Sequence, residues 1–565
     1  MFMKKRVLCF LLATIFALLC FPSAWAAVID SSTLYSIKSF GAMGDGITDD
    51  TAAIQAAIDS VSKNYGYGTV FIPEGEYVIT KQIALKSNVN IKGTGPKSVL
   101  ILRNITDTYF QAFMATSQKN IHISNFRGVN ECPNTYALWT HFLMSENCTV
   151  ENLIAEVSGI GSSQGNKEIR SKNIAFKNNT MYGNALGGAY FGLTGISFSF
   201  TTGGIATGNR IEYCAHGINW WGGDSNTVVD GAPENERCAQ NIVIANNVIE
   251  HVGGGGIWGS MGQNIVITNN VVNDAHDVGI DLEGTYDTIV SNNVVKDGYN
   301  GGLTTFFFCR GITFSGNTVY NSTPNTCGFK VYNSAQDIKN EDITVIGNTF
   351  VNTSEGTGVV GGDNCEKIIY ANNNFINVRM DHDFNNSRFT KVDSNHFVFD
   401  RPITNLKPAV EVGTTHKSGE CIFQNNLVES LVEQPEEVIG VFVTQSDNSS
   451  KTNNIIEGNI IKGFSTDIWL NNAAIRQKHV YAVDNNIFGS GNLKVDDTTV
   501  TTYQDNFRTD GGYLFAGIPG DGTYQTGQVI YFRTPDVENA IGAVCIEGGA
   551  PGKWKLFGFL KDGAQ

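Results

Sequence analysis

Asp281 and Glu283 are the two residues whose types and spacing point most directly to chemistry. They stand two residues apart in the segment VGIDLEG. In an extended strand, residues i and i+2 point to the same side, about 6.5 to 7 Å apart at the backbone. Two carboxylates that close raise the pKa of one of them, so one can donate a proton while the other serves as base or nucleophile. Glycoside hydrolysis needs this division, with carboxyl separations of ~5 to 5.5 Å for retention and ~6.5 to 9.5 Å for inversion, and the spacing leaves both open.

More ionisable residues lie just before this pair. Asp274, His276 and Asp277 occupy the preceding turn, and the repeat before it contributes Glu250 and His251. Charges gathered within two repeats are costly unless they act in catalysis or bind a metal ion. We assign Asp277 or His276 to tuning the acid pair. A Ca²⁺ site and solvated turn charges stay open as alternatives, and no metal ligand is assigned.

The region around the acid pair repeats itself, which indicates how these residues are positioned. Asn247, Asn270 and Asn293 stand 23 residues apart in three nearly identical segments. Such a period, built from short runs rich in Val and Ile, indicates stacked units of parallel strands. Corresponding residues then lie ~4.8 Å above one another. The same signal recurs, as structural turn residues, at Asn179, Asn209, Asn317, Asn348, Asn374, Asn395, Asn426, Asn459 and Asn486.

Alternation within the repeated strand predicts which side chains face the interior. The expected inward rows are Ile218, Ile257, Ile280, Leu303, Phe329 and Trp220, Gly259, Leu282, Thr305, Val331. The expected outward rows are Asn219, Trp258, Asp281, Thr304, Lys330 and Trp221, Ser260, Glu283, Phe306, Tyr332.

The outward rows place aromatic rings beside the acid pair. Aromatic faces stack on the C–H-rich faces of sugar rings, and polar groups bind sugar hydroxyls, so we expect a groove that holds an extended sugar chain. The alternative is a surface of strand residues without a ligand. The insertions before Asn241 and after residue 400 are expected to wall the groove. The candidate substrate contacts are Trp221, Trp258, Phe306, Tyr332, Lys330, Tyr299, Asn219 and His251.

The N-terminus carries the features of an export signal. Three basic residues precede a short apolar run that ends in Ala24-Trp25-Ala26, which predicts a signal peptide over residues 1–26 and a secreted, extracellular or periplasmic protein. A membrane anchor is the alternative, but the run is short for a span of ~20 residues. No later stretch is long and apolar enough to cross a bilayer.

Charge and cysteine content exclude several classes of partner. The formal charge of −15 becomes −18 once the three basic residues of the leader are removed. Such an acidic chain is a poor candidate for binding nucleic acid or an anionic bilayer, and its charge weighs mildly against a polyanionic substrate unless a cation bridges the two. The nine cysteines outside the leader show no CxxC spacing, so we expect neither a zinc site nor a dense disulfide framework. Pairing of Cys309 with Cys327 and buried free thiols both stay open.

Two phrases near the N-terminus, SFGAMGDGITDDTAAIQAAID and GTVFIPEGEYVI, resemble the opening of the pectate-lyase-like, rhamnogalacturonase and epimerase-like β-helix superfamily, which includes phage tailspikes. The resemblance implies an all-β, right-handed, single-stranded parallel β-helix with an N-terminal capping helix. Asp45, Asp49 and Asp50 are then turn and cap residues. GGAPGKWKLFG resembles the small β-module that ends many such proteins, with Trp554 expected to serve capping rather than sugar binding.

These observations divide the chain into four parts: the signal peptide 1–26, a cap with the first coils 27–90, the parallel β-helix 91–508 and a C-terminal β-module 509–565. The favoured function is a secreted glycoside hydrolase acting on a polysaccharide, with Asp281 and Glu283 as acid and base or nucleophile.

Two other functions stay open. One is a lyase or C5-epimerase on a uronate polymer, using His276, Tyr299, Arg310 and Lys330. The word Asp274-Ala-His-Asp is similar to the DPHD word of alginate C5-epimerases, without its proline and upstream tyrosine. The other is a non-catalytic, tailspike-like adhesin. The protein is expected to be a monomer or a homotrimer.

Overall fold

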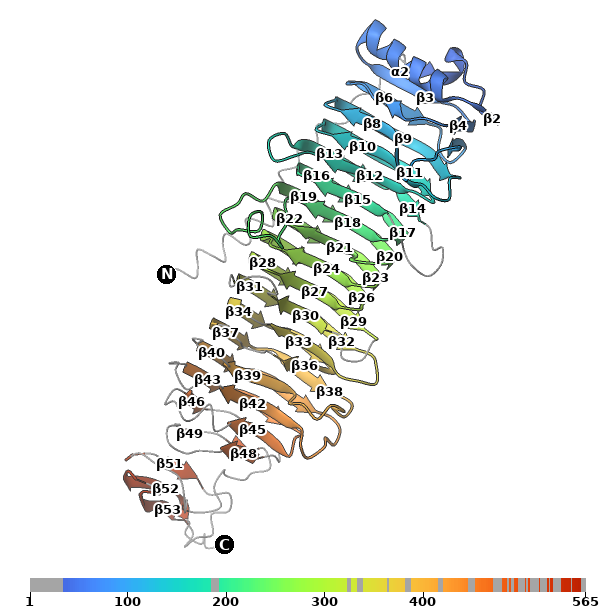
Figure 1. Cartoon of the computed structure of the whole chain (residues 1–565). Coiled ribbons are helices and arrows are strands. Elements are labelled where there is room, and N and C mark those ends of the chain that lie inside the picture. Colours follow the sequence, from blue (N-terminus) through green and yellow to red (C-terminus); the bar gives the residue numbers. More distant parts are fainter. Residues whose placement is uncertain are drawn as a thin grey trace.

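The protein is a long column of stacked parallel strands (Figure 1). This computed structural model describes residues 34–183, 193–322, 327–332, 339–362, 365–381, 388–414, 420–445 and 453–470, and shorter segments up to residue 559. One face is a sheet of 16 parallel strands, and the other two faces join through the long strands β9 (Lys119–Asn130) and β11 (Glu146–Glu156). The predicted right-handed parallel β-helix is confirmed.

Helix α2 (Thr51–Tyr65) lies at the N-terminal end of the column (Figure 1). Its apolar face is fully buried on the first coils, as its spacing predicts. Asp49 accepts a hydrogen bond of 3.0 Å from the amide of Thr51, the first helical residue. Asp50 instead accepts from the amides of Met43 and Gly44 and fixes the preceding turn. The helix therefore covers the open end of the coil, where unpaired strand edges would otherwise meet water.

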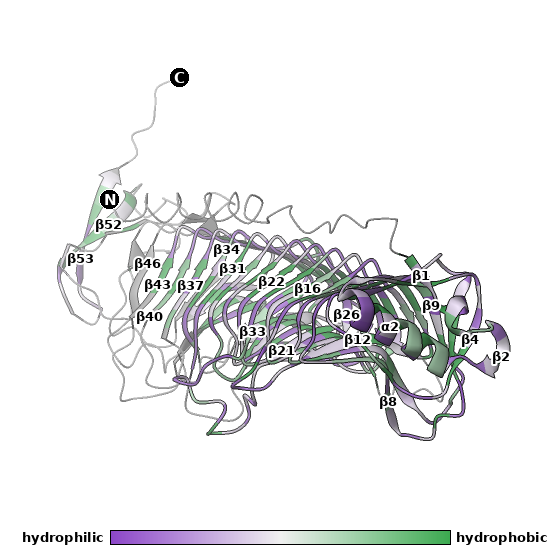
Figure 2. Cartoon of the chain, turned by 90° about the horizontal axis from the view of Figure 1, so that it is seen from above, coloured by the Kyte–Doolittle hydropathy of each residue, from purple (hydrophilic) through white to green (hydrophobic). Residues whose placement is uncertain are grey.

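The predicted register is confirmed on the 16-stranded sheet. Five neighbouring strands carry the site: β18 (His216–Trp221), β21 (Ile257–Ser260), β24 (Val278–Glu283), β27 (Gly301–Phe306) and β30 (Cys327–Tyr332). Trp258 pairs with Asp281, Asp281 with Thr304 and Thr304 with Lys330. Both predicted inward rows lie in the buried interior, and apolar and polar residues alternate in coil after coil (Figure 2).

A ladder of buried asparagines runs along one turn of the coils. The side-chain amide of Asn247 donates to Asn270 Oδ1 at 2.9 Å, and Asn270 donates to Asn293 Oδ1 at 3.0 Å. Each side-chain amide also donates to a backbone carbonyl, so both of its N–H groups are used. One predicted member is wrong: the ladder uses Asn373, whereas Asn374 begins the next strand, β35 (Asn374–Ile376).

The C-terminal segments include a separate antiparallel sheet of β51 (Val529–Tyr531), β52 (Ala540–Glu547) and β53 (Lys553–Phe559). Trp554 packs on its small core and donates to the carbonyl of Pro551. The predicted signal peptide lies outside the described residues. The boundaries at 90 and 508 stay predictions. Across the described ranges, no helix is long and apolar enough to span a membrane.

The described cysteines whose sulfur atoms form hydrogen bonds, Cys309 among them, are buried free thiols. Cys309 was predicted as a possible disulfide partner of Cys327, and of these two only the side chain of Cys309 is described. Its Sγ donates to the carbonyl of Leu282 at 3.2 Å. A disulfide from Cys309 is therefore absent from this structure. The side chain of Cys327 lies outside the described part.

Candidate active site

Asp281 and Glu283 both face outward from β24, as predicted, but neither stands on an open surface. Asp281 is only 6% exposed, and its Oδ1 accepts a hydrogen bond of 2.7 Å from Thr304 Oγ1 on the next coil. Glu283 Oε2 accepts a hydrogen bond of 3.1 Å from Ser225 Oγ. The two carboxyl groups are therefore held by different parts of the chain, Asp281 by its own sheet and Glu283 by an insertion.

This insertion, residues 222–238 between β18 and β19 (Ala239–Ala245), folds back onto the outer face of the sheet. The amide of Ser225 donates to Ser260 Oγ at 3.0 Å, and Ser260 Oγ donates to the carbonyl of Gly223 at 2.8 Å. Ser260, predicted to face the groove, is thus fully covered by the insertion. The insertion is the wall that the sequence predicts, and it reaches the acid pair itself.

Arg237 fixes the end of the insertion to the column. Its side chain is 2% exposed, and Nε donates to the carbonyl of Gly284 at 3.1 Å. The guanidinium lies 3.6 Å from the ring centroid of Tyr286, a close cation–π contact. Nη1 donates to the carbonyls of Pro233 and Asn235 within the insertion. One buried residue therefore joins the insertion to the strand region that carries Glu283.

Burial is the main reason why the pKa values of both carboxyl groups are raised. Loss of hydration raises the pKa of Asp281 well above its ordinary value, and the charge of Glu283 adds to this. Burial also raises the pKa of Glu283, while the hydrogen bond from Ser225 opposes the rise. The cause predicted from the sequence was repulsion between the two carboxylates. In the structure, burial raises the pKa of Asp281 more than this repulsion does.

Asp277 is the other predicted catalytic residue that acts on the pair. Its negative charge raises the pKa of both Asp281 and Glu283, and its Oδ1 accepts from Asn300 Nδ2 at 3.0 Å. His216 lies close by: its Nδ1 accepts from the amide of Gly255, and burial lowers its pKa. Burial therefore favours the neutral form of this imidazole, whose ring centroid lies 5.1 Å from that of Trp258. His216 was not among the predicted site residues, although it begins β18, a strand of the same sheet as β24.

His276, His251 and Tyr299 lie near Asp274, a residue of the strand that precedes β24. His251 Nδ1 lies 2.7 Å from Asp274 Oδ2, and His276 Nε2 lies 3.6 Å from Asp274 Oδ1. The rings of His276 and Tyr299 meet edge to face with centroids 5.1 Å apart. The structure therefore groups these three predicted residues in a second cluster, formed by β20 (Val248–Val252), β23 (Val271–Ala275) and the residues that follow β23 and β26 (Val294–Gly298), rather than in the row of Asp281.

Two pairs of aromatic rings flank β24 on adjacent coils. The centroids of Trp221 and Trp258 lie 6.3 Å apart on one side, and those of Phe306 and Tyr332 lie 5.8 Å apart on the other. Lys330 Nζ lies 4.8 Å from the ring centroid of Tyr332. The predicted grouping of these five residues around the acids is thus present.

Asn219 and Trp258 carry buried polar atoms that need partners. Asn219 Oδ1 and Trp258 Nε1 have no hydrogen-bond partner anywhere in the described structure. Such atoms cost free energy unless water or a ligand satisfies them. Both residues lie on the two coils before that of Asp281, in the same row of the sheet.

The turn charges do not form a metal centre. Within the described ranges, no group of three or more His, Cys, Asp or Glu residues is arranged to hold a metal ion. Glu250, one of the charges considered for Ca²⁺, instead forms an ion pair with Arg210 at 2.7 Å.

Two family models match the column. Residues 34–227 match "Rhamnogalacturonase A/epimerase, pectate lyase-like" and residues 230–350 match "Right handed beta helix region". The A-module of mannuronan C-5 epimerase AlgE4 from Azotobacter vinelandii superposes with a TM-score of 0.50 at 19% identity, covering 62% of this chain and 97% of that one. At this identity the likeness concerns the fold.

Two curated relatives match over short segments. Mannuronan C5-epimerase AlgE1 of Azotobacter vinelandii is 47% identical over 74 residues, which is 12% of this chain and 5% of that protein. Plasmin and fibronectin-binding protein A of Streptococcus pneumoniae is 39% identical over 82 residues, 14% of this chain and 11% of that protein. Each match thus covers a small part of both proteins.

Proposed function

Since the chain is a right-handed β-helix of the pectate lyase-like, rhamnogalacturonase A/epimerase type, we propose that it is a polysaccharide-degrading glycoside hydrolase. One observation carries the proposal. Asp281 and Glu283 share the outer face of β24, and a pair of aromatic rings lies on each side of them. A sugar chain stacked on both ring pairs would pass directly over the two carboxyl groups.

Asp281 is the general acid in this proposal. Its buried carboxyl group keeps a proton at a pH where an exposed aspartate has lost it, so it can protonate the leaving glycosidic oxygen. Thr304 orients the group through its hydroxyl. Glu283 is the base or nucleophile, because the hydrogen bond from Ser225 favours its ionised form. Asp277 sustains the proton on the pair through its nearby charge.

The rings and the polar atoms beside them supply binding. Trp221 and Trp258 would stack on sugar units at one side of the cleaved bond, and Phe306 and Tyr332 at the other. Asn219 Oδ1 and Trp258 Nε1 would meet sugar hydroxyls, which would satisfy two buried polar atoms.

A lyase or C5-epimerase on a uronate polymer is the second candidate. The segment shared with mannuronan C5-epimerase AlgE1 favours it, and so does the position of Lys330 in the row of Asp281, where it could neutralise a sugar carboxylate. His276, Tyr299 and Arg310 are its candidate bases and cations. In either case the protein would act outside the cytoplasm, after the predicted signal peptide of residues 1–26 is removed.

A panel of polysaccharides tests the proposal. The mature protein is incubated with each polymer while reducing ends and near-ultraviolet absorbance are read. New reducing ends without absorbance support hydrolysis, and they should vanish in Asp281→Asn and in Glu283→Gln. Absorbance from unsaturated products would transfer the assignment to a lyase, and altered uronate stereochemistry to an epimerase. Binding without any product would indicate a non-catalytic adhesin.

A further inference from the structure

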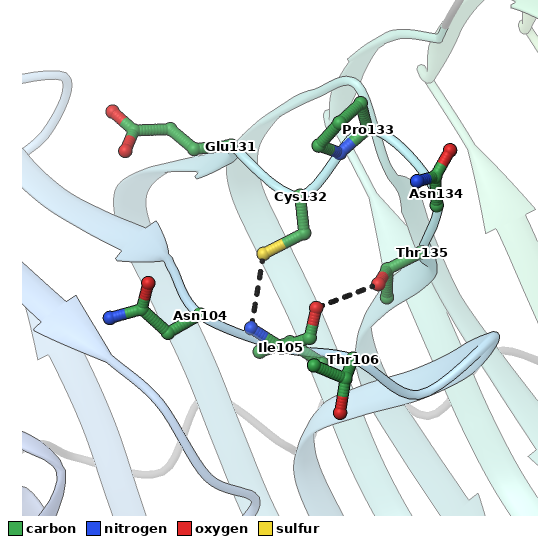
Figure 3. A pocket seen from close by; sticks show the side chains of 8 residues that line it. All are labelled: Asn104, Ile105, Thr106, Glu131, Cys132, Pro133, Asn134 and Thr135. Atoms are coloured by element: carbon green, nitrogen blue, oxygen red, sulfur yellow. Dashed lines mark hydrogen bonds between the residues drawn. The ribbon is translucent and has the colours of Figure 1, made fainter.

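A pocket of 390 Å³ is formed by residues near the N-terminal end of the column, several strands away from the acid pair on β24. Figure 3 shows its lining side chains from close by. The pocket is lined by two turns, residues 104–106 and 131–135. These turns lead directly into β8 (Tyr109–Thr116) and β10 (Tyr136–Leu143), which belong to the same 16-stranded sheet as β24. The pocket therefore lies at the edge of the sheet whose outer face carries Asp281.

We propose that this pocket, with the rings of Tyr109 and Tyr136, is a remote subsite that binds an uncharged sugar unit of the polymer. The inference rests on the proposed function for the polymer itself. It assigns to the chain a second contact with substrate that takes no part in the chemical step.

The two tyrosines form an aromatic platform. Their side chains are paired in register on adjacent coils, with ring centroids 5.4 Å apart and planes tilted by 38°. Tyr109 is 68% exposed, the mark of a ring that is free to stack on a ligand. The arrangement matches the ring pairs that flank β24, where the centroids lie 6.3 and 5.8 Å apart. The same device thus recurs on one sheet.

The walls of the pocket are fixed by bonds between the two turns. Thr135 Oγ1 donates to the carbonyl of Ile105 at 3.3 Å, and the amide of Ile105 donates to Cys132 Sγ at 3.4 Å (Figure 3). Because these contacts link successive coils, the pocket exists before any ligand arrives. A preformed site binds without the cost of ordering its walls.

The chemistry of the rim suits a sugar without charge. The side chains of Asn104, Thr106 and Asn134 are exposed and offer amide and hydroxyl groups. Glu131, the acid of the rim, is paired with Arg103 at 2.7 Å, so its charge is balanced within the protein. Amides, a hydroxyl and an aromatic platform together recognise hydroxyl-rich rings.

The distance to the acid pair sets the length of chain involved. From β10 to β24 the sheet order passes β12 (Gly159–Gln164), β15 (Thr194–Ser199), β18 and β21, which is five steps of ~4.8 Å, or ~24 Å along the column. Only a long chain reaches both places. The remote subsite therefore strengthens binding of polymer and leaves short fragments at the acid pair unaffected.

Affinity electrophoresis of the full mature chain tests the inference. The background is Asp281→Asn/Glu283→Gln, which leaves the polymer intact. Gels contain a neutral polymer (galactomannan, β-glucan or dextran) or an acidic one (alginate or polygalacturonate). Tyr109→Ala/Tyr136→Ala should weaken retention by a neutral polymer roughly tenfold, as the loss of about 1.4 kcal/mol of stacking would do. Tyr320→Ala, at an exposed tyrosine of strand β29 (Thr318–Asn321), is the matched control and should change nothing.

The outcomes separate this inference from the proposed function. If Trp221→Ala/Trp258→Ala loses retention while the Tyr109/Tyr136 variant keeps it, the remote subsite is refuted and the groove stands. If only acidic polymers retard the protein and the Tyr109/Tyr136 variant is retarded equally, the remote subsite is also refuted. If no polymer retards the protein and none is degraded, both proposals fail. In the active protein, the tyrosine variant should raise KM for polymer and leave KM for short fragments and kcat unchanged.

Discussion

Ser225 and Glu283 are 58 residues apart in the chain, yet the hydroxyl of Ser225 donates a 3.1 Å hydrogen bond to the carboxylate of Glu283. The contact exists because the insertion 222–238, which joins β18 to β19, reaches across the sheet to β24, two strands along from β18. The ionisation of Glu283 therefore depends on a residue of the insertion.

Removing this hydrogen bond should raise the pKa of Glu283 further. The bond stabilises the ionised form and opposes the effect of burial. In Ser225→Ala, the acidic limb of kcat/KM against pH should therefore move to higher pH, because a base must be ionised to act. Ser225→Thr keeps the hydroxyl and serves as control. A profile that superposes on that of the unmodified protein would remove Glu283 from the role of base.

Burial of Asp281 should make stability fall as the pH rises. A carboxyl group whose pKa is higher in the folded than in the unfolded protein binds a proton on folding, between its unfolded pKa of ~3.9 and its raised folded value. The unfolded state binds fewer protons in this window, so the free energy of unfolding decreases with pH there.

Asp281→Asn lacks this proton uptake, so it should gain stability over the unmodified protein as the pH rises from 4 towards neutrality. Thermal unfolding of both proteins across this range measures the difference. Asp107→Asn, at an exposed aspartate, is the matched control for the substitution itself. Parallel curves for Asp281→Asn would contradict the burial argument.

Breaking the asparagine ladder should destabilise the column without touching the groove. Asn270→Ala removes the side-chain acceptor of the buried backbone amide of Asn247 and a side-chain donor to the carbonyl of Ile244. We expect a loss of about 2 to 4 kcal/mol in the free energy of unfolding, measured with urea. Asn273→Ala, at a partly exposed residue of β23 (Val271–Ala275), should cost less than about 1 kcal/mol. Equal losses would show that the ladder is dispensable.

Arg237→Lys should loosen the insertion. A lysine retains the charge but cannot both lie flat on Tyr286 and donate to the carbonyls of Gly284 and the insertion. Deuterium uptake by residues 223–236 should rise, and turnover should fall because Ser225 no longer holds Glu283. Arg210→Lys, at an exposed arginine, is the control. Uptake like that of the control would mean that the insertion is held by other contacts.

Much of the architecture was predictable because it depends on a short repeat. The 23-residue spacing of Asn247, Asn270 and Asn293 fixes which residues are vertical neighbours, and strand alternation fixes which face the interior. The rows through Ile280 and Asp281 follow from these two facts. The error at Asn374 arose where three asparagines stand together and the pattern alone does not select one.

The predicted site was less complete, because the path of an insertion follows no period. His251 and Asp274 stand one repeat apart, as do His276 and Tyr299, but they form a cluster of their own beside the row of Asp281. Ser225 and Arg237 lie in an insertion whose path no spacing rule describes. The pocket beside Tyr109 and Tyr136 likewise depends on two turns that meet only when the coils stack.

The sequence by itself determined the coil, its register and the outward orientation of Asp281 and Glu283 on one face of the column, since these follow from local periodicity. Only the tertiary structure decided how much water reaches the two carboxyl groups. That depends on an insertion folding across several coils and on the hydroxyls of Ser225 and Thr304. Hydration is a property of the assembled surroundings of a group, so its effect on the pKa of Asp281 appears once the chain is folded.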